Sequence, residues 1–148
     1  MNGERIGSDA AMVWVFDVDG TLIGSIRSEM LRRGAVELLE ALTSRGVRCV
    51  LWSAGGDDYA RRMALQHGIE HHFSAFYGKA DRDGDARYVV DHFEVDLRPH
   101  IFVDDSPIDL PVGANVIAVP QFIGNNSSDG ALLAVLERLD ALLIETAR

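Results

Sequence analysis

The feature that most constrains the fold is an alternation along the chain between short apolar runs and longer stretches with apolar residues at helical spacing. Runs of strand length stand at 12–16, 47–52, 73–77, 100–103 and 115–119, and helical spacing stands at about 35–45, 57–67, 86–93 and 132–143. Continuous apolar runs are typical of strands covered on both faces of a parallel sheet. Their alternation with helices indicates repeated strand-helix units. The sequence therefore predicts an α/β fold with a mainly parallel sheet.

Helix boundaries are predicted from residues that favour helix ends. Gly46 and Gly68 can end the first two helices in the left-handed conformation. Asp57 can serve as the N-cap of the second helix, and Asp129 as that of the final helix. In parallel sheets of this class, ligands bind beyond the carboxyl ends of the strands, so the residues that follow each strand are the candidates for function.

Size and charge narrow the classes of protein that this chain can represent. Its 148 residues suit one domain, which we expect over residues 11–148 after a loose leader at 1–10. A net charge of -9 argues against extended binding of nucleic acid, which needs a basic face. The single cysteine, Cys49, lies in an apolar run and is expected to be buried and inert. No apolar stretch reaches the length of a membrane span, which favours a cytoplasmic protein.

The first candidate segment is Asp17-Val18-Asp19-Gly20-Thr21, directly after the first predicted strand. Alternate residues of an extended segment project to the same side, so Asp17 and Asp19 can face one reaction centre. Two such acids repel each other unless a cation lies between them, and Gly20 lets backbone N–H groups approach an anion. These features indicate a metal-assisted site, although an ordinary Asx turn is the alternative.

A hydroxyl and a lysine follow the next two predicted strands. Ser53 ends the second strand just before Ala54 and could bind a phosphoryl oxygen, or could be a simple turn residue. Lys79 is the only lysine in a chain that has thirteen arginines. A compact ammonium suits a site that must neutralise carboxylates and a phosphoryl group, although a surface position is the alternative.

The last candidate segment, Asp104-Asp105-Ser106-Pro107-Ile108-Asp109, follows the fourth predicted strand. Magnesium takes oxygen ligands and few protein carboxylates, so Asp105 could complete a site begun by Asp17. Asp104 competes with Asp105 for that role, and Asp104 or Asp109 could support the ligands. A helix N-cap followed by proline is the alternative.

The order of these four segments resembles that of the haloacid dehalogenase superfamily, over about 13–119. The resemblance implies a three-layer, doubly wound, Rossmann-like core with a small flap hairpin at 21–28. Thirty-one residues separate Thr21 from Ser53 and 25 separate Ser53 from Lys79, too few for the cap domain that many relatives insert. The chain thus looks like the capless branch.

The resemblance also implies a role for each position. Asp17 matches the nucleophile that forms an aspartyl-phosphate, and Asp19 matches the general acid and base. Val18, Gly20, Ser53, Ala54 and Lys79 would bind the phosphate together with the two acids. Mg²⁺ would be held by Asp17, the main-chain carbonyl of Asp19 and Asp105, with Thr21, Asp104 and Asp109 in support.

The resemblance implies a Mg²⁺-dependent phosphatase with an open site. Its substrate would be a phosphoprotein or a small phosphomonoester, and the protein could form oligomers. Two alternatives stay open at this point: a receiver that carries phosphate on an aspartate, and an interaction module with the same fold but no activity. A receiver has its acid pair first and a lone phosphoacceptor in the middle of the chain, whereas here a D-x-D pair comes first and a second acid pair comes last, so the motif order argues against the receiver. The presence of all four motif types argues against the module.

Overall fold

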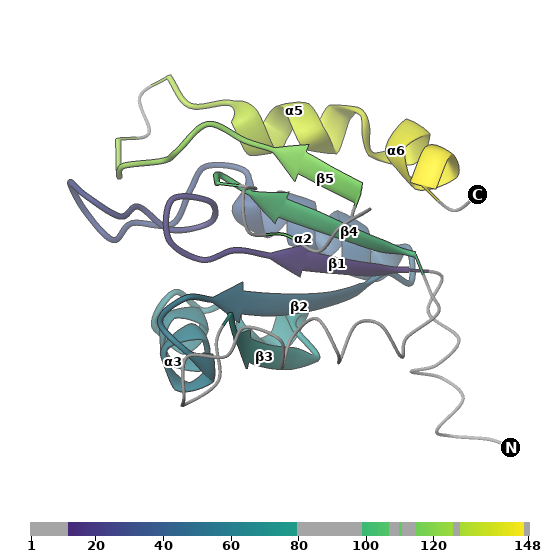
Figure 1. Ribbon diagram of the computed structural model, residues 1–148. Coiled ribbons are helices and arrows are strands. Elements are labelled where there is room, and N and C mark those ends of the chain that lie inside the picture. The colour runs from purple at the N-terminus through teal and green to yellow at the C-terminus, as the bar shows by residue number, and fades with distance from the viewer. Residues whose placement is uncertain (1–11, 80–98, 107–109, 111–114, 126–127, 147–148) are drawn as a thin grey trace, which may run out of the picture.

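The computed structural model describes residues 12–79, 99–106, 110, 115–125 and 128–146 of the chain, which form a parallel sheet with helices packed on it (Figure 1). Three expectations lie outside these residues: the leader at 1–10, the helix at 86–93 and the position of Asp109.

The sheet has five parallel strands in the order β3-β2-β1-β4-β5. They are β1 (Val13–Phe16), β2 (Arg48–Ser53), β3 (Ala75–Gly78), β4 (His100–Asp104) and β5 (Asn115–Ala118). The chain moves from β1 outward to β3 and then returns to the other side of β1. This reversal makes the carboxyl ends of β1 and β4 the topological switch point, where open sheets of this kind bind ligands.

The helices of the described residues are α2 (Ala35–Ser44), α3 (Asp57–Gln66), the 3₁₀ turn η1 (Glu70–His72), α5 (Ala131–Glu137) and α6 (Leu139–Thr146). Ala35, Leu38, Leu39 and Leu42 form the buried face of α2, as their spacing predicts. The described residues hold no helix of the length and apolarity that a membrane span requires.

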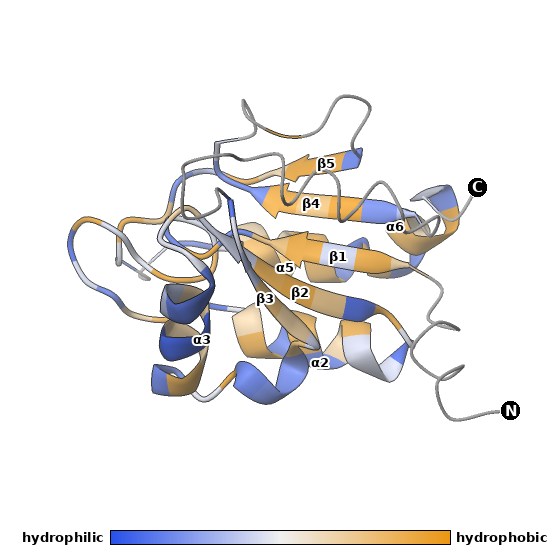
Figure 2. Ribbon diagram, turned by 60° about the horizontal axis from the view of Figure 1, so that its bottom comes forward, coloured by the Kyte–Doolittle hydropathy of each residue, from blue (hydrophilic) through white to orange (hydrophobic). Residues whose placement is uncertain are grey.

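The strands β1, β2 and β4 are buried on both faces, as their continuous apolar runs predict, and Figure 2 shows the strands mainly in the hydrophobic colour. The residues of the edge strand β5 are exposed or half-buried. On one face, Trp14 and Phe16 of β1 join a cluster with residues of α2, α3 and α5. On the opposite face, Val13, Val15 and Trp52 belong to a second buried cluster. The two clusters hold the sheet rigid beneath its carboxyl edge.

Two predicted helix caps are wrong. The N-cap of α3 is Gly56, and Asp57 is already the first helical residue. The N-cap of α5 is Gly130, whereas the carboxylate of Asp129 forms two hydrogen bonds of 2.8 Å with the guanidinium of Arg32. The Asp129 carboxylate therefore pairs with the Arg32 guanidinium and does not cap the helix.

Two further elements differ from expectation. The final helix is interrupted at Arg138, so that α5 and α6 are separate helices. The third strand occupies Ala75–Gly78, later than the 73–77 that composition predicts, because residues 70–72 form η1. These shifts leave the order of elements unchanged.

The segment after β1 forms a compact flap loop. It is closed by an antiparallel bridge between Ile23 and Leu31 and by a hydrogen bond of 2.9 Å from the Gly24 amide to the Met30 carbonyl. The predicted flap is therefore present as a loop closed by one antiparallel bridge, and it extends beyond residue 28. Residues 12–79 are described without a gap, and they hold no cap domain.

Candidate active site

A cavity of about 270 Å³ opens at the carboxyl edge of the sheet, where β1, β2, β3 and β4 end. Its lining combines acids, a lysine, hydroxyl groups and two apolar walls: Asp17, Asp19, Trp52, Ser53, Ala54, Lys79, Asp104, Asp105, Ser106 and Leu110. The four segments that the sequence singles out thus meet at one place. The sheet causes this convergence, because parallel strands in register bring their carboxyl ends to one edge.

Asp17 lies on the floor of this cavity. Its amide continues the strand ladder by donating to the Val103 carbonyl at 3.0 Å, which fixes the backbone where β1 ends. One carboxylate oxygen accepts a hydrogen bond of 2.8 Å from Lys79 Nζ, and the other accepts one of 2.9 Å from Thr21 Oγ1. The side chain is therefore buried and held on both sides.

Lys79 is fixed by the neighbouring strands. Its amide donates to the Ser53 carbonyl at 2.8 Å, and its ammonium reaches Asp17 and, at 3.0 Å, Asp104 Oδ2. The other oxygen of Asp104 accepts the Ser106 amide at 2.8 Å. Both oxygens of this buried carboxylate are thus engaged by groups of the protein. The Lys79 ammonium also lies 5.0 Å from the centre of the Trp52 ring, within the range of a cation–π contact.

Asp105 approaches the loop that follows β1. Its amide donates to Thr21 Oγ1 at 3.0 Å, and Thr21 Oγ1 lies 3.3 Å from Asp105 Oδ1. Gly20 has a φ of 83° and lies so close that a Cβ at this position would overlap Asp105 Oδ2. A side chain at Gly20 would therefore push Asp105 away from Asp17.

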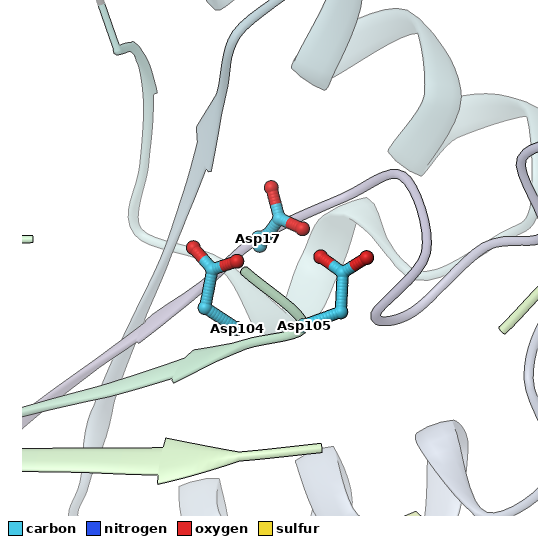
Figure 3. Close-up of side chains that lie close together, drawn as sticks. All are labelled: Asp17, Asp104 and Asp105. Atoms are coloured by element: carbon cyan, nitrogen blue, oxygen red, sulfur yellow. The ribbon is translucent and has the colours of Figure 1, made fainter. Parts of the chain in front are cut away.

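Three carboxylates point toward a common volume (Figure 3). Asp17, Asp104 and Asp105 each offer an oxygen, and these atoms lie within 4.8 Å of one another. An all-oxygen donor set suits a hard divalent cation such as Mg²⁺. The residues therefore fit a metal, and Asp17, Asp104 and Asp105 are its candidate ligands.

The electrostatics of the metal-free site favour a cation. The pKa of Asp17 is raised from its ordinary value of 3.8 to about 7. Burial is the largest cause, the charge of Lys79 opposes it, and the hydrogen bond with Asp105 and the charge of Asp104 add to the increase. Burial on its own would lower the pKa of Lys79, but Asp17 and Asp104 together raise that pKa above its ordinary value. Lys79 is therefore held as an ammonium, whereas Asp17 gains a proton easily when no metal is bound.

Asp19 lies at the mouth of the cavity with an exposed side chain. Its Oδ1 accepts a hydrogen bond of 2.7 Å from the hydroxyl of Tyr59, a residue of α3. Burial, followed by the hydrogen bond to Asp19, raises the pKa of Tyr59 above its ordinary value, so the phenol stays protonated and donates. Sequence reasoning missed Tyr59, because its position on a helix carries no signal of contact with Asp19.

The residues expected to bind phosphate differ in what they can offer. Ser53 is buried, and its Oγ accepts the Gly55 amide at 3.0 Å, which uses a lone pair and not the hydroxyl proton. Ser53 can therefore stabilise the turn through its lone pair and still donate its hydroxyl proton to a phosphoryl oxygen. The Gly20 amide donates to the Ile23 carbonyl at 2.8 Å, so this N–H is not available to an anion. The side chain of Val18 is buried in the core.

Solved structures share this fold at low sequence identity. A haloacid dehalogenase-like family hydrolase from Streptococcus pneumoniae matches the structure with a TM-score of 0.65 at 16% identity, over 90% of this chain and 99% of that chain. An uncharacterized protein from Listeria monocytogenes serotype 4b matches with a TM-score of 0.60 at 15% identity, over 90% and 99% of the two chains.

The 3-deoxy-D-manno-octulosonate 8-phosphate phosphatase of Moraxella catarrhalis matches with a TM-score of 0.53 at 16% identity, over 98% of this chain and 99% of that chain. The sequence matches no curated protein significantly. The model of the NLI interacting factor-like phosphatases matches residues 12–147. This chain belongs to that family, which confirms the resemblance to the haloacid dehalogenase superfamily.

Proposed function

We propose that this phosphatase hydrolyses phosphomonoesters in two steps, with Asp17 as the nucleophile and Mg²⁺ as the cofactor. The observation that carries the proposal is the setting of the Asp17 carboxylate, which lies on the cavity floor between Lys79 and Thr21. A carboxylate held in this way keeps one orientation toward a phosphorus atom that enters from the mouth.

In the first step, an oxygen of Asp17 attacks phosphorus, and the bond from phosphorus to the ester oxygen breaks. Asp19, at the mouth, gives its proton to the leaving oxygen, so that an alcohol departs. In the second step, water attacks the phosphorus of the aspartyl-phosphate and gives a proton to Asp19. The bond from phosphorus to Asp17 breaks, inorganic phosphate leaves and Asp17 returns to its starting state.

Charge on the transferring group would be balanced by residues that line the cavity. The Lys79 ammonium can bind a phosphoryl oxygen while keeping its contact with Asp104. The hydroxyl proton of Ser53 and the main-chain amide of Ala54 would bind further oxygens, since both residues line the cavity. We assign phosphate binding to these residues and not to the Gly20 amide, which is engaged within its own loop.

The proposed magnesium ligands are Asp17, Asp105 and the main-chain carbonyl of Asp19, with Thr21 and Asp104 in support. Carboxylate oxygens of Asp17, Asp104 and Asp105 lie within 4.8 Å of one another, which supports a cation at this place. We assign Asp104, the third of these acids, to the support of the ligands because it pairs with Lys79. The Moraxella phosphatase was solved in complex with magnesium and phosphate ions. When bound, the cation would stabilise negative charge on the phosphoryl oxygens.

The proposed substrate is a phosphomonoester whose leaving group extends out of the site. A cavity of about 270 Å³ suits a phosphoryl group and a small part of what it is attached to, and residues 12–79 hold no cap domain. Both a phosphoprotein and a small phosphomonoester can meet these conditions. A screen of small phosphate esters beside phosphopeptides distinguishes them.

The test of the proposed function is hydrolysis of 4-nitrophenyl phosphate. We expect turnover with Mg²⁺, none with EDTA, and loss of turnover in Asp17→Asn. Asp140→Asn is the matched control, because Asp140 lies on the surface in an ion pair with Arg45. Unchanged activity of Asp17→Asn would refute the nucleophile. A lasting phosphoaspartate without turnover would indicate a receiver, and inactivity on a broad phosphoester panel would indicate an interaction module.

A further inference from the structure

The hydroxyl of Tyr59 lies 2.7 Å from Asp19 Oδ1, although the two residues are 40 positions apart in the chain. Among the described residues, it is the one side chain that hydrogen-bonds this carboxylate. Asp19 follows the end of β1 and is exposed, so nothing else in the described part of the chain fixes the orientation of its carboxyl group. A contact of this length with a carboxylate is a strong, charge-assisted hydrogen bond.

The ring of Tyr59 is itself well anchored. Tyr59 stands in the first turn of α3 and packs against the main core cluster. The guanidinium of Arg62, one turn later, lies 5.4 Å from the ring centre. Gly55 lies against the ring edge, where an added Cβ would come within 2.6 Å of Tyr59 Cδ2. The hydroxyl therefore has a defined position, set by the start of α3 and not by Asp19.

We propose that Tyr59 is a positioning residue that holds Asp19 Oδ1, so that Oδ2 carries the proton exchanged with the substrate. This inference rests on the proposed function. Asp19 lines the cavity mouth, where a leaving oxygen departs, and the hydroxyl of Tyr59 can donate to Oδ1 whether Oδ2 is protonated or not. Without this contact the carboxyl group rotates freely, and a smaller fraction of molecules has Oδ2 directed at the leaving oxygen.

The expected effect depends on how much the leaving group needs a proton. 4-Nitrophenolate leaves readily without one, whereas phenolate and alkoxides are more basic and need the acid. In Tyr59→Phe, which keeps the ring and removes the hydroxyl, kcat/KM for phenyl phosphate should fall about tenfold, the value of one hydrogen bond to a charged group. For 4-nitrophenyl phosphate it should fall less than about twofold on the same basis.

The experiment measures kcat/KM for both esters in the wild type, Tyr59→Phe and the matched control Tyr77→Phe, a tyrosine of β3 that does not line the cavity. Calorimetry with Mg²⁺ should give the same affinity for Tyr59→Phe as for the wild type.

The outcomes separate this inference from the proposed function. A wild type inactive on both esters overturns the proposed function and this inference with it. An active wild type in which Tyr59→Phe loses nothing, or loses equally on both esters, overturns the inference alone. A weakened affinity for Mg²⁺ in Tyr59→Phe also overturns it, because the residue would then act through the metal site. Selective loss on phenyl phosphate with unchanged Mg²⁺ affinity supports it.

Discussion

At the scale of single residues, the site is defined by a buried carboxylate whose charge the protein only partly balances. Asp17 has one ammonium beside it, from Lys79, but two further acids in Asp104 and Asp105. The pKa of Asp17 is raised to about 7, and burial is the largest cause. The metal-free site therefore takes up a proton at neutral pH that a divalent cation must displace.

The first prediction is that Mg²⁺ binding releases protons in a manner that depends on pH. Because the folded pKa of Asp17 is raised from 3.8 to about 7, the metal-free carboxyl is largely protonated below that value. Release should approach about one proton per ion near pH 6 and vanish well above pH 8. Calorimetry in buffers of different ionisation enthalpy measures it. Asp17→Asn should abolish the release, and a release that does not vary with pH would contradict the prediction.

The same shift has a defined sign for stability. At pH values between 3.8, the ordinary pKa of Asp17, and about 7, its pKa in the fold, the carboxyl group is protonated to a greater extent in the folded state than in the unfolded state. Its contribution to the stability of the metal-free protein is therefore present at low pH and is lost as the pH rises through this window. The site is electrostatically unfavourable for the fold, and a cation removes the cost.

At this scale, the sequence correctly predicts that polar residues at the strand ends meet in one cavity. Asp17, Ser53, Lys79 and Asp105 could be found because each stands at or just after a strand end, and parallel strands share an edge. The choice between neighbouring acids could not be made, because it depends on side-chain partners that are distant in sequence. Tyr59 was missed for a related reason, since no pattern links the first turn of a helix to a loop 40 residues earlier.

At the scale of elements, the flap loop is tied to the segment after β5 by a buried arginine. Arg32 pairs with both oxygens of Asp129 at 2.8 Å and donates to the carbonyls of Pro120 and Thr21, at 2.9 and 3.2 Å. Its side chain is 1% exposed and that of Asp129 is 15% exposed. The contact with Thr21 connects this ion pair to the segment after β1, from which Asp17 and Asp19 line the cavity.

The second prediction concerns this ion pair. Asp129→Ala leaves the Arg32 guanidinium buried without its anion, and should lower the free energy of unfolding by about 3 kcal/mol. The matched control is Asp140→Ala, which breaks a surface pair whose side chains are 39% and 78% exposed and should cost less than about 1 kcal/mol. Urea unfolding with unchanged slope measures both. Equal losses in the two variants would contradict a structural role for the Arg32 pair.

The elements themselves were largely predictable. The five apolar runs become the five strands, with ends shifted by one or two residues, and the four buried residues of α2 lie at the predicted spacing. The Asp57 cap is wrong by one residue, because α3 already begins at Asp57. The Asp129 cap failed because Asp129 has two competing partners, the helix amides and Arg32. A buried guanidinium is a stronger partner than the unpaired amides of a helix end, and the spacing of Asp129 from the helix cannot reveal Arg32.

At the scale of the whole molecule, the reversal of strand order places β1 beside β4 and so joins Asp17 to Asp105. The alternation of strands and helices predicts a parallel sheet, but it does not specify the order of the strands. A net charge of -9 adds a second effect, since a divalent cation also reduces repulsion across the molecule. A stability measurement with metal must separate site binding from this general screening.

The third prediction makes that separation. With free Mg²⁺ at about 100 times its Kd, binding to the folded state alone stabilises by about 2.7 kcal/mol, and Tm should rise by about 5 to 10 °C. Sodium chloride at the same ionic strength screens the charge without entering the site, so it should raise Tm by much less. Asp105→Asn should lose the Mg²⁺-specific part of the shift. Asp140→Asn should keep it, because Asp140 lies in an exposed ion pair with Arg45 and does not line the cavity. If Mg²⁺ and sodium chloride gave the same shift, the acids at the edge of the sheet would be a solvated cluster and not a metal site.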